Sequence, residues 1–156
     1  MVSFRHPAAV CALLATVAVL GAACGGSSKS APASSNSTVA TADSGVGSIL
    51  VDRQGETLYL FAKDRGGASA CSGACAKAWP PYAAKGAALH VGSGLKASLL
   101  KSMTRADGTK QLTVSGSPLY TFAGKPAGDV SGQGVGGFYV VQASGKKYDP
   151  GAASGS

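Results

Sequence analysis

Two cysteines four positions apart are the residues of this sequence whose type and spacing most clearly suggest a chemical role. They lie in the stretch CSGACAKAWPP, from Cys71 to Pro81, which also contains Trp79, the only tryptophan of the chain. Such a pair can form a structural disulfide, cycle as a redox couple, or supply half of a metal site. The choice depends on the compartment of the protein and on the other ligands in the chain.

The N-terminal segment predicts export from the cytoplasm. Residues 1–23 have the order of a secretion signal, because Arg5 is followed by the uncharged run AAVCALLATVAVL and then by small residues. That run of 13 residues is shorter than the roughly 20 apolar residues that a membrane-spanning helix needs. A buried core helix is the alternative, but no amphipathic face or capping pattern accompanies the run.

The end of this signal, LGAAC, resembles the lipobox of bacterial lipoproteins, in which small residues precede an acylated cysteine. The resemblance implies that Cys24 carries fatty acyl chains such as palmitate, becomes the first mature residue, and holds the protein on the outer face of the cytoplasmic membrane. Two chains are enough for stable anchoring, because each buried methylene contributes about 0.8 kcal/mol. Ordinary cleavage after Ala23 is the alternative, and it would leave a lone exposed thiol.

Export narrows the chemistry of the remaining cysteines. With Cys11 in the signal and Cys24 acylated, Cys71 and Cys75 are the only thiols left. In an oxidising compartment two neighbouring cysteines of a small domain are most simply read as a disulfide.

Two alternatives remain open for the pair. A redox or electron-transfer role requires a cysteine of lowered pKa, for which Lys77 is the nearby cation. Copper handling requires a further soft ligand or a histidine, and the chain offers Met103 and His90. We expect the structural disulfide, and we predict no metal site and no cofactor.

Composition divides the rest of the chain. Residues 24–45, which contain GGSSKSAPASSNSTVATADS, are expected to form a lipidated flexible tether, because such small polar residues bury too little apolar surface to fold. As a coil, those 20 quoted residues span on the order of 25 Å. A β-rich domain is predicted over residues 46–150, and residues 151–156 are predicted to be a disordered tail. A chain of this size supports one core.

The predicted domain contains an internal repeat. TLYLF, residues 57–61, recurs as PLYTF, residues 118–122, displaced by 61 positions, and each copy follows an apolar run and a turn. Side chains alternate along a strand, so the two aromatic residues of each copy share one face. These pairs are Tyr59 with Phe61 and Tyr120 with Phe122. We expect them to meet in the core about a pseudo-two-fold axis, with a ligand groove as the alternative.

Other segments complete the predicted fold. GFYVV, residues 137–141, predicts a further strand, for five or six strands in all. LKASLLKSM, residues 95–103, and ACAKAW, residues 74–79, predict one or two short helices. The fold class is therefore mainly β: one small domain of two related β-hairpin repeats.

These features resemble a family of bacterial lipoproteins with a Tyr-x-aromatic-x-x-Asp motif, also called the secreted repeat of unknown function. The motif residues of the first repeat are Tyr59, Phe61, Asp64, Cys71, Cys75, Trp79, Pro80 and Pro81. Those of the second are Arg105, Asp107, Gly108, Tyr120, Phe122, Gly128, Asp129 and the glycines of GQG at 132–134. Lys125 stands where the second aspartate is expected, so the second copy either has lost its half of a paired structural contact or uses Asp129 instead. The resemblance implies an extracytoplasmic lipoprotein without an established reaction.

Several patterns that suggest catalysis have simpler interpretations. GQGVGG, residues 132–137, has the spacing of a dinucleotide-binding loop but leads into a strand rather than a helix, so we expect a hairpin connection. His90 is the sole histidine of the mature chain and is expected at the surface or at a strand edge. The chain therefore offers no second histidine from which a Ser-His-Asp triad could be built. Asp64 is expected to cap a turn. We predict no catalytic residues.

Charge limits the class of partner. Removing Arg5 with the signal leaves 13 Lys and Arg against 7 Asp and Glu, a net charge near +6. The longest basic run is Lys146-Lys147, and an exported chain does not meet nucleic acid, so we expect no such partner. The sequence therefore predicts a membrane-anchored extracytoplasmic lipoprotein, a non-enzymatic binding or interaction module for an unknown envelope ligand or protein. A redox or electron-transfer accessory, or copper handling, is the alternative.

Overall fold

The computed structural model describes residues 39–85 and 89–151, and within them the chain is mainly β. The strands are β1 (Val39–Ser44), β2 (Gly47–Asp52), β3 (Tyr59–Phe61), β4 (Leu100–Thr104), β5 (Lys110–Val114), β6 (Ser117–Pro118) and β7 (Phe138–Val140). The helical turns are α1 (Ala74–Ala78) and the 3₁₀ turns η1 (Ala97–Leu99) and η2 (Val135–Gly137). In this part of the chain, no helix has the length and apolar character to cross a bilayer.

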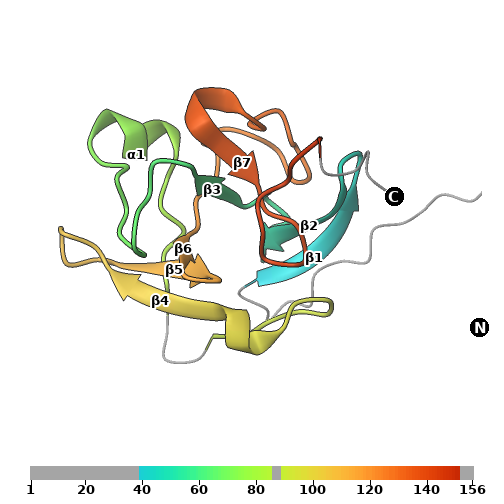
Figure 1. The fold of residues 1–156 in the computed structure, drawn as a ribbon, viewed down its shortest axis with the longest axis horizontal. Coiled ribbons are helices and arrows are strands. Elements are labelled where there is room, and N and C mark those ends of the chain that lie inside the picture. The colour runs from blue at the N-terminus through green and yellow to red at the C-terminus, as the bar shows by residue number, and fades with distance from the viewer. Residues whose placement is uncertain (1–38, 86–88, 152–156) are drawn as a thin grey trace, which may run out of the picture.

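Two hairpins with the same plan form the scaffold (Figure 1). β1 pairs antiparallel with β2, and β4 pairs antiparallel with β5. After a turn, the segment that follows each hairpin runs back along its second strand. Leu58 N–H donates to the carbonyl of Leu50 at 2.9 Å, and Leu119 N–H donates to that of Leu112 at 2.9 Å. The predicted pair of hairpin repeats is confirmed.

The two return turns use different chemistry. In the first repeat, the Asp52 carboxylate accepts the N–H groups of Gln54 and Glu56 at 2.8 and 2.9 Å. In the second, Ser115 and Gly116 have φ values of 50° and 81°. Positive φ at both central residues is the pattern of a type I′ turn, whose twist matches that of the flanking strands.

Each repeat also inserts a segment into the other. The backbone of Val141, beyond β7, donates to Leu58 at 3.0 Å and accepts from Leu50 at 2.7 Å. The backbone of Tyr82, beyond α1, donates to Leu119 at 2.8 Å and accepts from Leu112 at 2.8 Å. Each hairpin is thus completed by a segment from the end of the other repeat, and the two repeats form a single domain.

A local two-fold relation joins the repeats at their tyrosines. Tyr59 N–H donates to the Tyr120 carbonyl at 2.9 Å, and Tyr120 N–H donates to the Tyr59 carbonyl at 3.0 Å. Reciprocal bonds between residues 61 positions apart place equivalent points of the two copies directly opposite each other. The core divides around this point into an aliphatic cluster, which contains Leu58 and Leu119, and an aromatic one.

The structure corrects the predicted start of the domain. Residues 39–45 were expected to belong to the tether, but Val39 begins β1 and its side chain is completely buried. The small polar residues of this segment suit a strand once β2 supplies its hydrogen-bonding partners, which composition alone does not reveal. The strand total within the described residues is accordingly seven rather than five or six.

The helix predicted over residues 95–103 is also wrong. Only Ala97–Leu99 form a 3₁₀ turn, and Leu100–Thr104 form β4. The four-residue spacing of apolar side chains favoured a helix, but pairing with β5 overrides that local preference. The short helix predicted over residues 74–79 is confirmed as α1, and the strand predicted over residues 137–141 is confirmed as β7.

Candidate functional site

Four aromatic rings form a continuous stack through the centre of the domain. Phe61 lies on Phe138 with centroids 4.2 Å apart, Phe138 on Trp79 at 4.0 Å, and Trp79 on Phe122 at 4.1 Å. Successive planes differ by 8°, 5° and 9°. We call these four rings the aromatic stack. Of the rings predicted to meet, Phe61 and Tyr120 do so edge to face at 6.4 Å, whereas Phe61 and Phe122 are separated by Phe138 and Trp79.

The stack obeys the pseudo-symmetry of the repeats. Tyr59 meets Trp79 edge to face at 5.1 Å, and Tyr120 meets Phe138 in the same way at 5.3 Å. Both tyrosines are buried, with exposed fractions of 1% and 0%. The core role predicted for these tyrosines is therefore confirmed.

A lysine lies at each end of the aromatic stack. The Nζ of Lys63 is 6.0 Å from the Phe61 centroid, and that of Lys125 is 5.2 Å from the Phe122 centroid. Both end rings are partly exposed. Lys125, which replaces the expected second aspartate of the motif, thus has a ring contact equivalent to that of Lys63.

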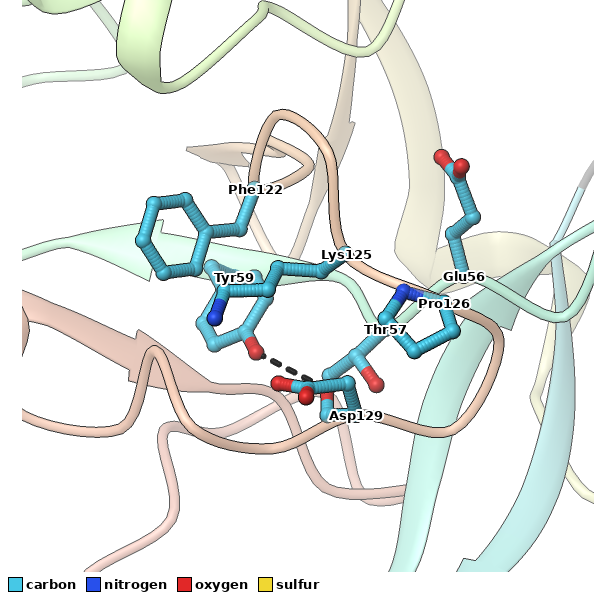
Figure 2. A pocket seen from close by; sticks show the side chains of 7 residues that line it. All are labelled: Glu56, Thr57, Tyr59, Phe122, Lys125, Pro126 and Asp129. Atoms are coloured by element: carbon cyan, nitrogen blue, oxygen red, sulfur yellow. Dashed lines mark hydrogen bonds between the residues drawn. The ribbon is translucent and has the colours of Figure 1, made fainter.

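The tyrosine hydroxyls bond across the repeats. Tyr120 Oη donates to Asp64 Oδ2 at 2.9 Å, and Tyr59 Oη donates to the backbone carbonyl of Asp129 at 3.0 Å (Figure 2). Burial raises the pKa of both tyrosines to about 12, so both remain protonated donors near neutral pH. The Asp129 carboxylate therefore does not replace the missing aspartate, because Tyr59 bonds to the main-chain carbonyl of this residue and not to its side chain.

The two aspartates have opposite electrostatic surroundings. Asp64 also accepts the N–H of Ala70 at 2.7 Å, which confirms its predicted role in a turn, and burial raises its pKa. The Asp129 carboxylate accepts the hydroxyl and N–H of Ser131 at 2.5 and 2.8 Å, and these bonds lower its pKa. Asp64 is thus the carboxylate whose charge the fold disfavours.

Cys71 and Cys75 form a disulfide, as predicted. Cys71 is buried, whereas Cys75 is partly exposed at α1. Trp79 N–H donates to the Cys75 carbonyl at 2.8 Å, and Pro80 follows, so the helix ends as its chain turns inward. Trp79 retains an exposed fraction of only 6%. The cysteine loop therefore delivers Trp79 to the aromatic stack.

Arg105 clamps this loop from the other repeat. Its guanidinium donates to the Cys71 carbonyl at 2.6 Å, to Ser69 Oγ at 2.8 Å and to Gln111 Oε1 at 2.6 Å. Its side chain is 7% exposed, and its Nε lies 3.6 Å from Asp107. The sequence presented Arg105 only as a motif residue. The order RADG indicates a turn, but nothing local predicts a contact 34 positions away.

Gly132 explains the glycine-rich segment. A Cβ at this position would lie 2.7 Å from Trp79 Cη2 and 2.9 Å from Tyr59 Cε1. The next side chain, Gln133, accepts the N–H of Val140 through Oε1 at 2.8 Å. The segment is a connection into β7, as expected, and its glycine permits close packing against the two rings.

The remaining candidate ligands do not converge. Within residues 39–85 and 89–151, no three His, Cys, Asp or Glu side chains gather as a metal site would require. His90 is exposed, and its carbonyl accepts the N–H of Val39 at 3.2 Å, which agrees with the predicted strand-edge position. Cys24 lies outside the described residues.

Two open grooves lie at pseudo-equivalent places. The basic groove, about 440 Å³, is lined by Leu60, Phe61, Ala62, Ser115, Ser117, Tyr139, Gly145, Lys146 and Lys147. The mixed groove, about 270 Å³, is lined by Asp52, Arg53, Gln54, Glu56, Pro81, Tyr82, Ala83, Lys85 and Thr121. Leu60 and Thr121 correspond at the 61-residue displacement, and each groove borders the return turn of the opposite repeat. The duplicated scaffold thus carries two grooves of different chemistry.

Comparison with known proteins identifies the two repeats independently. The sequence model of a protein family described as a secreted repeat of unknown function matches residues 40–83 and 101–141, more than half of the chain. The first match runs from β1 past Pro81, and the second runs from β4 past β7. No curated protein and no solved structure matches the chain.

Replacing Gly132 by alanine should destabilise the domain by about 1–3 kcal/mol, because the added methyl overlaps the Trp79 and Tyr59 rings. Urea denaturation gives the loss, and near-ultraviolet circular dichroism reports the changed tryptophan environment. Gly45→Ala is the matched control, since nothing lies within 4 Å of its added Cβ. Equal stabilities of the two variants would contradict the packing role.

The pH dependence of stability tests the buried carboxylate. Because burial raises the pKa of Asp64 above its ordinary 3.8, the folded state binds this proton more tightly than the unfolded state. The free energy of unfolding of the native chain, minus that of Asp64→Asn, should therefore fall as pH rises from about 3.8 through the raised pKa. Urea denaturation at a series of pH values measures this difference.

Asp107→Asn is the control of opposite sign for that experiment. Hydrogen bonds from Thr109 lower the pKa of Asp107, so the corresponding difference should rise with pH through the lowered pKa up to about 3.8. A difference that rises with pH for Asp64 as well would refute the stated effect of its burial.

Removing the disulfide through Cys71→Ser with Cys75→Ser should cost about 2 kcal/mol, because so short a loop restricts the unfolded chain only slightly. Urea denaturation measures the loss. Equilibration of the native chain in glutathione buffers should give a potential below about −300 mV, as structural disulfides have. A potential near about −200 mV would instead support the redox alternative.

Proposed function

The chain belongs to the family of secreted repeats of unknown function, and from that premise we propose that it is a membrane-anchored lipoprotein whose folded domain is a non-enzymatic binding module of the cell envelope. Membership of a secreted family indicates an extracytoplasmic location. The lipid anchor at Cys24 and the envelope ligand belong to the proposal. Its main support is the pair of open grooves on a tightly packed duplicated scaffold.

The polar network around Tyr120 supports a non-enzymatic role, since its side chains bond to one another. The Tyr120 hydroxyl lies 2.7 Å from Ser69 Oγ and 2.9 Å from Asp64, and Ser69 in turn accepts from Arg105. The Arg105 guanidinium continues this network to Gln111 and the cysteine loop. These groups connect the repeats and the loop of Trp79, a structural task that accounts for their burial.

The N-terminal sequence supports the anchor. Small residues precede Cys24, and the segment from 25 to 38 is rich in serine, glycine and alanine. This composition supports the proposed tether between Cys24 and β1, because small polar residues bury little apolar surface. Such a tether would hold the grooves near the membrane while leaving the domain free to reorient.

Replacing Cys24 by alanine tests both parts of the proposal. The native chain should partition into detergent and yield an N-terminal peptide that begins with acylated Cys24, by mass spectrometry. Cys24→Ala should appear in the medium, because the acyl chains supply the anchoring energy. The released chain should still co-sediment saturably with isolated cell envelopes.

Cys11→Ala is the control, since the proposed signal containing it is removed and anchoring should persist. An unmodified N-terminus at another residue would overturn the anchor. A released chain that does not co-sediment with envelopes would overturn the binding module.

A further inference from the structure

The outer face of the β3–β7 pair forms the floor of the basic groove. Leu60 and Tyr139 are directly paired in the antiparallel register, so their side chains lie next to each other on one face. Their neighbours along each strand point the opposite way, into the aromatic cluster. The floor of the groove is therefore an apolar and aromatic surface supported by the domain's core.

The walls of the groove are held rigidly. Gly145 packs so closely that an added Cβ would lie 2.8 Å from Ser115 Oγ and 3.1 Å from Val114 Cγ2. The loop that carries Gly145 is closed by the backbone of Gln142. The Gln142 carbonyl accepts the N–H of Gly145 at 2.8 Å, and the Gln142 N–H donates to the main-chain carbonyl of Lys146 at 2.8 Å. A preformed groove loses little conformational entropy when a ligand binds.

The electrostatics of the groove are one-sided. Lys146 and Lys147 line it, and no acidic residue is among the described residues that do. The Nζ of Lys147 lies 4.8 Å from the Tyr139 ring centroid, which holds this charge over the aromatic floor. The groove therefore attracts a negatively charged ligand.

We propose that the basic groove binds an anionic glycan of the cell envelope, with a sugar ring against Leu60 and Tyr139 and its acidic groups against Lys146 and Lys147. This inference rests on the proposed binding function and names its ligand class. Sugars combine an apolar ring face with hydroxyls, and Ser115 and Ser117 supply hydroxyl partners at the wall. The volume of about 440 Å³ falls in the range of about 300–1,000 Å³ typical of ligand pockets.

Shape favours a polymer chain over the membrane surface. A bilayer is flat, and it could contact the lysines at the rim but not the floor formed by Leu60 and Tyr139. A chain of sugar rings can enter the groove and reach the floor and the lysines together. This difference separates the two sources of negative charge in the experiment below.

The mixed groove supplies an internal comparison. It carries Lys85 and Arg53, but also Asp52 and Glu56, so its lining charges cancel. At the position equivalent to Leu60 it has the polar Thr121. Tyr82 gives it an aromatic residue, but it lacks the net positive charge of the basic groove. Lys85 is therefore the matched control for the lysines of the basic groove.

Titration calorimetry of the full-length chain purified in detergent tests the proposal with two glycan probes, tetragalacturonate for carboxylates and phosphomannan oligosaccharide for phosphates. At least one should bind, more weakly as salt increases, and Lys146→Ala with Lys147→Ala should weaken it about tenfold. Tyr139→Ala should weaken it as well, whereas Lys85→Ala should stay within about twofold of the native chain. Unchanged urea midpoints ensure that the variants are folded.

Three results would overturn the inference. If neither probe binds although the chain co-sediments with isolated envelopes, the proposed binding module stands and the proposed ligand class is wrong. If Lys85→Ala weakens binding as much as Lys146→Ala with Lys147→Ala does, the basic groove is not the binding site. If both glycans fail to bind and vesicles of phosphatidylglycerol bind through Lys146 and Lys147, the ligand of the groove is the membrane. Absence of envelope co-sedimentation would remove the proposed function itself.

Discussion

The stack of Trp79 on Phe138 is the contact on which the arrangement of the domain depends. These rings lie 4.0 Å apart and nearly parallel, and each continues outward to the phenylalanine of one repeat motif. Each aromatic pair contributes about 0.5–1.5 kcal/mol beyond the area it buries. Trp79 and Phe138 each lie at the end of the long connection that follows the Tyr-x-Phe segment of a repeat. The stack can therefore form only when both connections have folded back to the centre of the domain. It therefore couples local hairpins into one cooperative structure.

Duplication provides the scaffold, and small departures from symmetry distinguish its two sides. The tyrosine hydroxyls show this at the level of single bonds: one reaches a carboxylate of Asp64, and the other reaches the main chain at Asp129. The grooves show it at the level of surfaces, since equivalent places carry Leu60 on one side and Thr121 on the other. The shared core preserves the fold, while its exposed edges have acquired different charge and polarity.

The cysteine loop has a local task within this plan. The disulfide spans four positions, so it shapes the entry of α1 rather than restricting the whole chain. Arg105 complements it by joining the loop backbone to the second repeat. Its buried guanidinium satisfies several oxygen acceptors at once, as its planar arrangement of donors allows. A covalent link and a hydrogen-bonded clamp together hold the approach of Trp79 to the aromatic stack.

Features that depend on neighbouring residues follow from the sequence alone: two hairpins from the recurrence of TLYLF as PLYTF, alternating aromatic faces, and a one-turn helix ended by Pro80. Sequence patterns misassigned Val39–Ser44 and Leu100–Thr104, because both become strands only when a distant strand offers hydrogen-bonding partners. The ring that faces Trp79, the acceptors of Arg105 and the different linings of the two grooves were likewise decided by the tertiary structure. Periodicity and turn residues act over a few positions, whereas stacking, clamping and groove formation require contacts between residues far apart in the chain, whose pairing no local pattern encodes.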